Sequence, residues 1–308
     1  MKVLPAAHPE SLVVSRSRAV DYLELCKPRI SVMVLFTVAA GAILASRGAP
    51  NAAVLINALI GTGLVAAGAS ALNQLLERDT DALMHRTENR PLPSGRLQAM
   101  DVCRFGLILA VVGLVYLAIM VRQPLNVLVA AVTLFSYVCL YTPLKRKTSL
   151  NTLIGAIPGA LPPVIGWTAV TGTIGPEAVA LFLILFLWQV PHFLAIAWLY
   201  RDDYARAGLQ MLPSVAGGEA ITGRQMVSYC MVLIPASLAP AALRMAGPWY
   251  AAAALTLGFA FLASAIAFTR GHSTGRARRV LRASLIYLPV LLTALLINGT
   301  LPAAVLSP

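Results

Sequence analysis

Long apolar segments joined by short polar connections constrain this chain more than any other feature of its sequence. A helix needs roughly 17 to 25 predominantly apolar residues to cross the hydrocarbon core of a membrane. Nine such segments can be recognised, at residues 30–46, 53–76, 102–120, 125–141, 151–170, 178–199, 225–243, 249–269 and 281–299. The composition agrees, because 58% of the residues are hydrophobic and only 12% are charged. The sequence therefore predicts an all-α membrane protein in which nine transmembrane helices form a bundle.

The basic residues are distributed unevenly over the connections between these segments. If the N-terminus is cytoplasmic, all but three of the 24 Lys and Arg residues lie on the cytoplasmic side, the exceptions being Arg47, Arg122 and Arg244. Cytoplasmic connections of membrane proteins typically carry such an excess. We therefore expect a multi-pass protein of the cell inner membrane, with a cytoplasmic N-terminus and an extracytoplasmic C-terminus. This topology explains the net charge of +12 without nucleic-acid binding.

The predicted helices form a single transmembrane domain over residues 30–300. Residues 1–29 are polar and show no periodic pattern, which favours a disordered cytoplasmic arm. No short apolar core with a cleavage site is present there, so we predict no cleaved signal peptide. Residues 301–308 are expected to form a short extracytoplasmic tail.

A run of charge follows the second apolar segment, "NQLLERDTDALMHRTENRPLPSGRL" at residues 73–97. If the helix continues past Leu76, then Asn73, Glu77 and Asp81 share one face, because residues four apart lie above one another on a helix. Hard oxygen donors of this kind suit Mg²⁺, which completes its coordination with water and substrate phosphate. The ladder therefore predicts a metal site formed by these three residues, whereas a solvated helix end is the alternative.

Basic residues accompany the ladder on the same side of the membrane. Arg86 and Arg90 follow it, and "YTPLKRKTSLNT" supplies Lys145 and Arg146 after the fourth segment. Guanidinium groups bind phosphate oxygens through paired hydrogen bonds, so acids followed by arginines fit a metal diphosphate. For any one of these residues, a role in fixing membrane orientation explains the charge equally well.

The connection after the sixth segment offers a second acidic group. It contains Tyr200, Asp202, Asp203 and Tyr204. Adjacent helical residues point to different faces, so at most one of the two aspartates shares a metal with Asp81. Which one does stays open, and Asp203 is taken as the candidate.

His192 is the only histidine in a predicted span. An ionisable residue within a membrane is a candidate functional group, but His192 can equally serve as a hydrogen-bonding group within the bundle. The fifth segment, "GAIPGALPPVIGW" at residues 155–167, contains three prolines and predicts a bent helix beside a cavity.

Four stretches carry a resemblance to a known family: the Asn73, Glu77, Asp81 ladder with "MHRTENRPLPSGR", then "YTPLKRKTSLN", "GAIPGALPPVIGW" and "WQVPHFLAIAWLYRDDYARAGLQMLP". Over roughly residues 20–300, the chain resembles the UbiA-type intramembrane prenyltransferases, and in detail the branch that farnesylates protoheme IX. It departs from the general motifs of the superfamily in two ways. Gln74 follows Asn73 where an aspartate is usual, and the second acidic motif is an adjacent rather than a spaced pair of aspartates.

The resemblance implies a nine-helix bundle around a lipid-open cavity, capped on the cytoplasmic side by the loops after the second and sixth helices. It implies transfer of a farnesyl group from farnesyl diphosphate to a vinyl group of protoheme IX, or heme B, with addition of water to give heme O. Mg²⁺ is the implied cofactor, His192 a candidate heme contact, and a heme A synthase a candidate partner in the lipid bilayer.

Two other functions compete with this interpretation. A related prenyltransferase could use an aromatic acid or a quinone precursor as acceptor. An organic-anion transporter is suggested by the weak repeat between "LPSG" at 92–95 and "LPSV" at 212–215. Transporters usually place polar groups near the bilayer midplane, whereas the charges here gather at one end, which favours the enzyme.

Overall fold

The structure is a computed structural model that describes residues 17–299. In this part of the chain nine helical spans are long and apolar enough to cross a membrane, which confirms the prediction. Seven are single helices, of which the first six are α2 (Pro28–Ala45), α3 (Ala52–Asp81), α4 (Ala99–Met120), α9 (Pro176–Leu199), α11 (Gly218–Ala242) and α12 (Pro248–Thr269). The last span is α13 (Thr274–Gly299), and the two remaining spans are composite.

The composite spans contain breaks in regular helix geometry. The fourth span, Pro124–Leu144, consists of α5 (Pro124–Phe135), the π-helical turn η1 (Ser136–Tyr141) and α6 (Thr142–Leu144). The fifth consists of α7 (Asn151–Ala160) and α8 (Pro162–Thr171), which separate at Leu161. The bend predicted from the prolines of this segment is therefore present.

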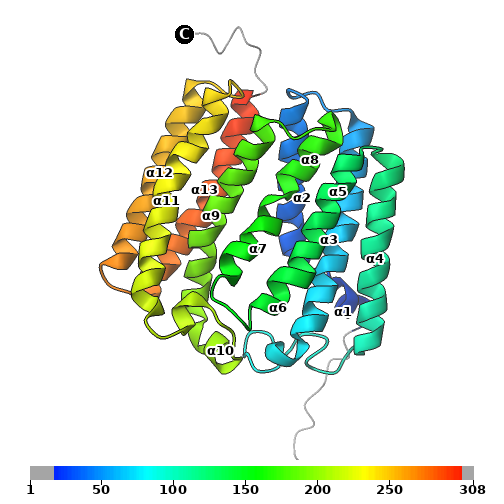
Figure 1. Ribbon diagram of the computed structural model, residues 1–308, viewed down its shortest axis with the longest axis vertical. Coiled ribbons are helices and arrows are strands. Elements are labelled where there is room, and N and C mark those ends of the chain that lie inside the picture. The colour runs from blue at the N-terminus through cyan, green and yellow to red at the C-terminus, as the bar shows by residue number, and fades with distance from the viewer. Residues whose placement is uncertain (1–16, 300–308) are drawn as a thin grey trace, which may run out of the picture.

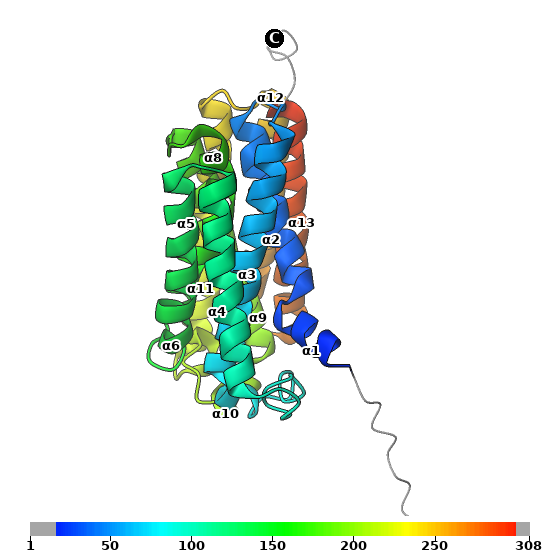
Figure 2. The ribbon, with the colours of Figure 1, turned by 90° about the vertical axis from the view of Figure 1, so that its right-hand side faces the viewer.

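The spans run side by side along the long axis of the molecule (Figure 1). The short helices α1 (Arg18–Leu25), α6 and α10 (Arg201–Arg206) lie at one end, together with the α3–α4 connection, as Figure 2 also shows. The 3₁₀ turn η2 (Leu212–Ser214) precedes α11. The far end of α13 lies at the opposite end, as an odd number of spans requires.

Glycines allow the central helices to approach one another closely. A Cβ atom on Gly68 of α3 would lie 2.6 Å from the backbone oxygen of Gly106 in α4, and one on Gly113 would lie 2.8 Å from the backbone nitrogen of Val65. In the same way Gly166 of α8 packs against the backbone of α2. Small residues of this kind let membrane helices pack backbone to backbone, because lipid supplies no hydrophobic driving force between them.

The N-terminal arm differs from the prediction over its described part. Residues 18–25 form the helix α1 rather than a disordered tail. The reason is a buried ion pair, in which Nε of Arg96 lies 2.8 Å from Oδ1 of Asp21 and fixes α1 against the α3–α4 connection. Residues 1–16, and the tail predicted at 301–308, lie outside the described residues.

Candidate functional site

The oxygen-bearing ladder lies on the last turns of α3, which continues to Asp81 as the spacing required. Asn73, Glu77 and Asp81 line one cavity of about 150 Å³ at the charged end of the bundle. Asn73 and Asp81 are each only 1% exposed. Three polar groups are thus held beneath the surface on one helix face, which a solvated helix end would not do.

Each member of the ladder is paired with a different cation. Nζ of Lys27 lies 2.8 Å from Oδ1 of Asn73. Nζ of Lys145 lies 2.6 Å from Oε1 of Glu77, and a guanidinium nitrogen of Arg90 lies 2.6 Å from Oδ2 of Asp81. Buried charges are costly unless they are paired, so these contacts let the fold keep a charged cluster at the edge of the hydrocarbon.

One carboxylate oxygen of Asp81 has no hydrogen-bond partner among the described residues. Its Oδ2 accepts from Arg90, whereas Oδ1 is buried and has no hydrogen-bond partner among the described residues. An unsatisfied buried carboxylate oxygen is unfavourable, and a bound cation would remove that cost. The donor set of one amide and two carboxylates therefore fits Mg²⁺.

Lys27 is a site residue that the sequence reasoning did not select. It joins α1 to α2 with a left-handed backbone (φ 46°), and this turn directs its side chain into the cavity. Burial, followed by the charge of Arg90, lowers the pKa of Lys27 to about 7. The signal that could have found it is the Lys-Pro pair immediately before the first span, because a proline keeps the residue before it out of right-handed helix geometry and so ends α1 there.

The π-helical turn supplies two further residues that were missed, Tyr137 and Tyr141. With Lys145 they form a second ladder of four-residue steps, opposite the one on α3. The hydroxyl of Thr142 accepts from Asn73 Nδ2 at 3.1 Å and donates to the backbone oxygen of Tyr137 at 2.8 Å. π-Helical turns occur frequently at functional sites, and this one aligns both tyrosines with the acids.

Burial alone would lower the pKa of Lys145. Its interactions with Tyr141 and with the carboxylate of Glu77 have a larger effect, and they raise the pKa above its usual value. Together with Lys27, Arg86 and Arg90, Lys145 gives the cavity more basic than acidic side chains. The cavity is therefore suited to an anion as well as to a metal.

Arg86 connects the two acidic loops. Its guanidinium carbon lies 4.6 Å from the ring centre of Tyr200 and 5.6 Å from that of Tyr204, and it donates to the Tyr204 hydroxyl at 3.2 Å. Arg86 and Tyr204 both line the cavity. Predicted residues from both loops thus meet at one place.

The two aspartates of the second loop do not line this cavity. Oδ1 of Asp203 lies 3.2 Å from a guanidinium nitrogen of Arg206. Asp202 is exposed and lies 3.8 Å from Arg201. Tyr204 is the residue of this short helix that faces the cavity, because it lies on a different face of α10 from Asp203. The metal-binding role of Asp203 stays a prediction.

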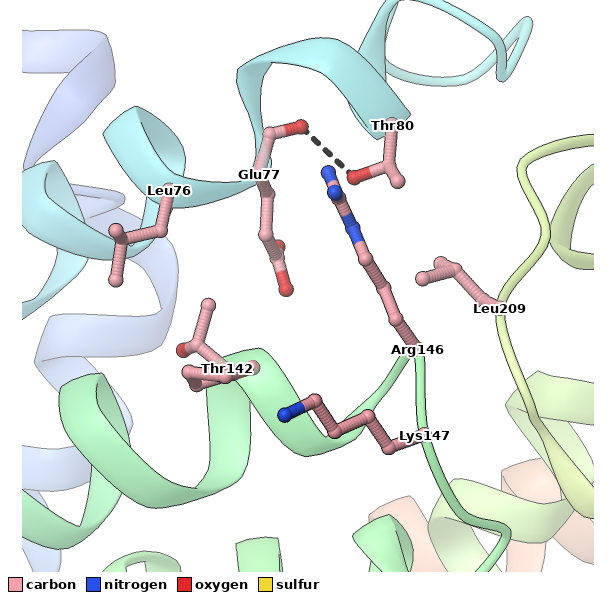
Figure 3. Close-up of a pocket in the computed structure, with 8 residues that line it drawn as sticks. Leu76, Glu77, Thr80, Thr142, Arg146, Lys147 and Leu209 are labelled. Atoms are coloured by element: carbon pink, nitrogen blue, oxygen red, sulfur yellow. Dashed lines mark hydrogen bonds between the residues drawn. The ribbon is translucent and has the colours of Figure 1, made fainter.

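Arg146 lines a neighbouring cavity of about 230 Å³, which shares Glu77 and Leu209 with the first. In Figure 3 its side chain extends from the end of α6 toward Thr80 of α3. The predicted pair of basic residues is therefore split, with Lys145 in one cavity and Arg146 in the other. His192 lines neither; it lies within α9 and contacts α13.

Known proteins match this chain over most of its length. The model of the UbiA prenyltransferase family matches residues 34–300. A protoheme IX farnesyltransferase of Solibacter usitatus is 47% identical over 287 residues, which cover 90% of this chain and 98% of the relative. One from Myxococcus xanthus is 46% identical over 298 residues, covering 95% and 98%.

Solved structures share the fold. A digeranylgeranylglyceryl phosphate synthase superposes with a TM-score of 0.78 at 17% identity, covering 92% of this chain and 98% of its own. A UbiA homolog from Archaeoglobus fulgidus, bound to DMAPP and Mg²⁺, superposes with a TM-score of 0.60 at 15% identity, covering 90% and 99%.

Proposed function

This chain belongs to the UbiA prenyltransferase family, and from that membership together with its relatives we propose that it transfers a farnesyl group from farnesyl diphosphate to a vinyl group of protoheme IX, giving heme O and diphosphate. The chain is a multi-pass membrane protein and a prenyltransferase. The proposal adds the donor, the acceptor and the residues that act on them. The alternatives of an aromatic acceptor or an organic-anion transporter gain no support from any observed contact.

The pairing of the α3 ladder with Lys27, Lys145 and Arg90 is the observation that carries the diphosphate half of the proposal. Asn73, Glu77 and Asp81 would hold Mg²⁺, and the unsatisfied Oδ1 of Asp81 supports this assignment. The homolog from Archaeoglobus fulgidus bound to DMAPP and Mg²⁺ supports the same ligand class. When bound, the metal would neutralise charge on the diphosphate.

The basic residues of the cavity stabilise the leaving group. When the C–O bond of the allylic diphosphate breaks, both electrons leave with the diphosphate oxygen. Lys27, Arg86 and Arg90 donate hydrogen bonds to the oxygens on which this charge develops. The remaining farnesyl cation must be kept from bulk water. The apolar spans beside the cavity exclude water from the cation.

The acceptor half rests on the relatives, which are named protoheme IX farnesyltransferases. The terminal vinyl carbon bonds to C1 of the farnesyl group, water adds to the neighbouring carbon as hydroxyl, and a proton is released. Farnesyl chains and porphyrins both partition into lipid. A site with an apolar interior and a charged end therefore suits the two substrates. We place the charged end on the cytoplasmic side of the cell inner membrane. The basic connections gather at this end of the bundle, and an excess of Lys and Arg marks the cytoplasmic side of membrane proteins.

The test is a product assay. Purified protein in lipid nanodiscs is incubated with farnesyl diphosphate, Mg²⁺ and either heme B or an aromatic acceptor such as 4-hydroxybenzoate, and products are resolved by mass. We expect farnesylated heme carrying a hydroxyl group, and no prenylated aromatic acid. A folded protein that prenylates only the aromatic acid, or neither acceptor, would contradict the proposal.

A further inference from the structure

His192 has an arrangement that the chemistry at the charged cavities does not use. Among the described residues it is the only histidine within a span, because His85 and His272 lie in connections. His192 is half-buried, with Trp188 stacked on its ring and Phe193 at its edge. It lies eight residues before Tyr200, which is about 12 Å along a helix axis at 1.5 Å per residue.

The hydrogen bonds around His192 determine which ring nitrogen carries the proton. Nδ1 lies 2.8 Å from the hydroxyl oxygen of Ser284 in α13. That hydroxyl donates its only proton to the backbone oxygen of Leu281, at 2.7 Å. With that proton directed to Leu281, the hydroxyl oxygen accepts from Nδ1 of His192, and this assignment of the tautomer puts the lone pair on Nε2.

A second contact fixes the plane of the ring. Trp188, one turn earlier in α9, stacks on His192 with ring centres 4.8 Å apart and planes inclined by 23°. The indole nitrogen of Trp188 donates to the backbone oxygen of Ser284 at 2.8 Å, so the same serine anchors both rings. No described residue forms a hydrogen bond with Nε2 of His192. The fold thus orients a lone pair and leaves it free.

We propose that Nε2 of His192 binds the iron of the porphyrin acceptor, with Ser284 and Trp188 as positioning residues. Histidines that bind metals typically donate their other N–H to a fixed acceptor, which sets the tautomer and the ring orientation, as Ser284 does here. A neutral imidazole is a common protein ligand of heme iron. Iron ligation at His192 places the porphyrin within the membrane span, farther into the bundle than the cavity lined by Asn73, Glu77 and Asp81. This inference rests on the proposed function, because it takes protoheme IX as the acceptor.

The test measures heme binding without farnesyl diphosphate, so that it is independent of turnover. The full chain, stripped of heme, is titrated with heme B while its absorption spectrum is recorded, and the ferrous complex is examined by resonance Raman for the iron–imidazole stretch. We compare the wild type with His192→Gly, His192→Gln and Ser284→Ala, and use His85→Gly as the control for an exposed histidine.

We expect the wild type and His85→Gly to give an imidazole-ligated spectrum and an iron–imidazole band. Both His192 variants lose them, and free imidazole restores the spectrum of His192→Gly. Ser284→Ala keeps the ligand but shifts the Raman band, and its heme affinity falls about tenfold or more, as for loss of a group that supports a metal ligand. Retained Mg²⁺-dependent binding of a farnesyl diphosphate analogue shows that each variant is folded.

An unchanged heme spectrum in both His192 variants overturns the inference, as does a wild type without imidazole ligation. The product assay on the wild type, run in parallel, separates this failure from failure of the proposed function. If farnesylated heme forms while the His192 variants keep the wild-type spectrum, only the iron ligand is wrong. If no farnesylated heme forms from folded wild type, the acceptor itself is wrong.

Discussion

Nζ of Lys145 lies 2.6 Å from Oε1 of Glu77, although the two residues are 68 positions apart in the chain. Their side chains are only 16% and 12% exposed. This ion pair joins α3 to the end of the fourth span and holds together two walls of the cavity that Asn73, Glu77 and Asp81 line.

Removal of one partner from this pair is expected to destabilise the protein. Lys145→Met leaves Glu77 buried and unpaired, and breaking a buried pair in this way costs about 3–5 kcal/mol. The double variant Glu77→Gln with Lys145→Met should recover part of the loss. Thermal unfolding in detergent measures both effects. The exposed pair of Arg78 and Asp79 is the control, and equal losses from Asp79→Asn and Lys145→Met would contradict the account.

Asp81→Asn tests the metal assignment. The asparagine keeps a neutral oxygen for Arg90 but removes the anionic Oδ1, so turnover should fall by about 10²-fold or more while the protein stays folded. Initial rates of farnesyl transfer over a range of Mg²⁺ concentrations provide the measurement. Asp79→Asn, on the exposed face of the same turn, should leave the rate unchanged. Wild-type rates for Asp81→Asn at every Mg²⁺ concentration would remove Asp81 from the metal site.

Lys27 is expected to bind the diphosphate directly. Lys27→Gln keeps a hydrogen-bond donor near Asn73 but removes the cation, and loss of a charged hydrogen bond corresponds to about tenfold or more in affinity. Binding of a farnesyl diphosphate analogue can be followed by isothermal titration. Arg29→Gln, an exposed cation at the start of α2, is the matched control. If the two variants bind alike, Lys27 has no part in anion recognition.

Arg86 should order the second acidic loop through its contacts with Tyr200 and Tyr204. Arg86→Ala is expected to increase hydrogen–deuterium exchange at residues 200–211. Arg86→Lys should behave similarly, because a lysine lacks the planar group that stacks on both rings. Arg78→Ala, which removes an exposed guanidinium, serves as the control. Unchanged exchange in both Arg86 variants would show that this contact does not hold the loop.

Close packing of α2 on α8 gives a prediction about stability. A Cβ atom on Gly166 would collide with the backbone of Val38, and backbone cannot yield as a side chain can. Gly166→Ala should therefore cost about 1–3 kcal/mol or more, or lower the yield of folded protein. At Gly63 of α3 the added atom would meet only Leu35, at 3.7 Å, so Gly63→Ala is the control. Equal thermal stability of the two variants would contradict this packing.

The sequence predicted those parts of the structure that follow from local periodicity. Apolar length defined the nine spans, and four-residue spacing placed Asn73, Glu77 and Asp81 on one face of α3. The bend near Leu161 followed from the proline that begins α8. Each of these features depends on neighbours in the chain, which a single sequence displays.

Features that depend on partners distant in the chain were not predicted. The helix α1 is held by Arg96, which lies 75 residues from Asp21. Lys27 turns toward the cavity through its own left-handed backbone, but its partner there, Asn73, lies 46 residues away in the chain. Spacing within the second loop left open which aspartate shares the metal, and the register of α10, which brings Tyr204 to the cavity, depends on packing that a single sequence does not display.

The central claim is that the cluster around Glu77 and Asp81 binds an isoprenoid diphosphate together with Mg²⁺. Calorimetric titration of the wild type with a non-reactive farnesyl thiodiphosphate, once with Mg²⁺ and once with EDTA, tests it most directly. The account predicts tight binding that requires Mg²⁺ and that is lost in Asp81→Asn. Equal affinity with Mg²⁺ and with EDTA, unchanged by Asp81→Asn, would contradict it.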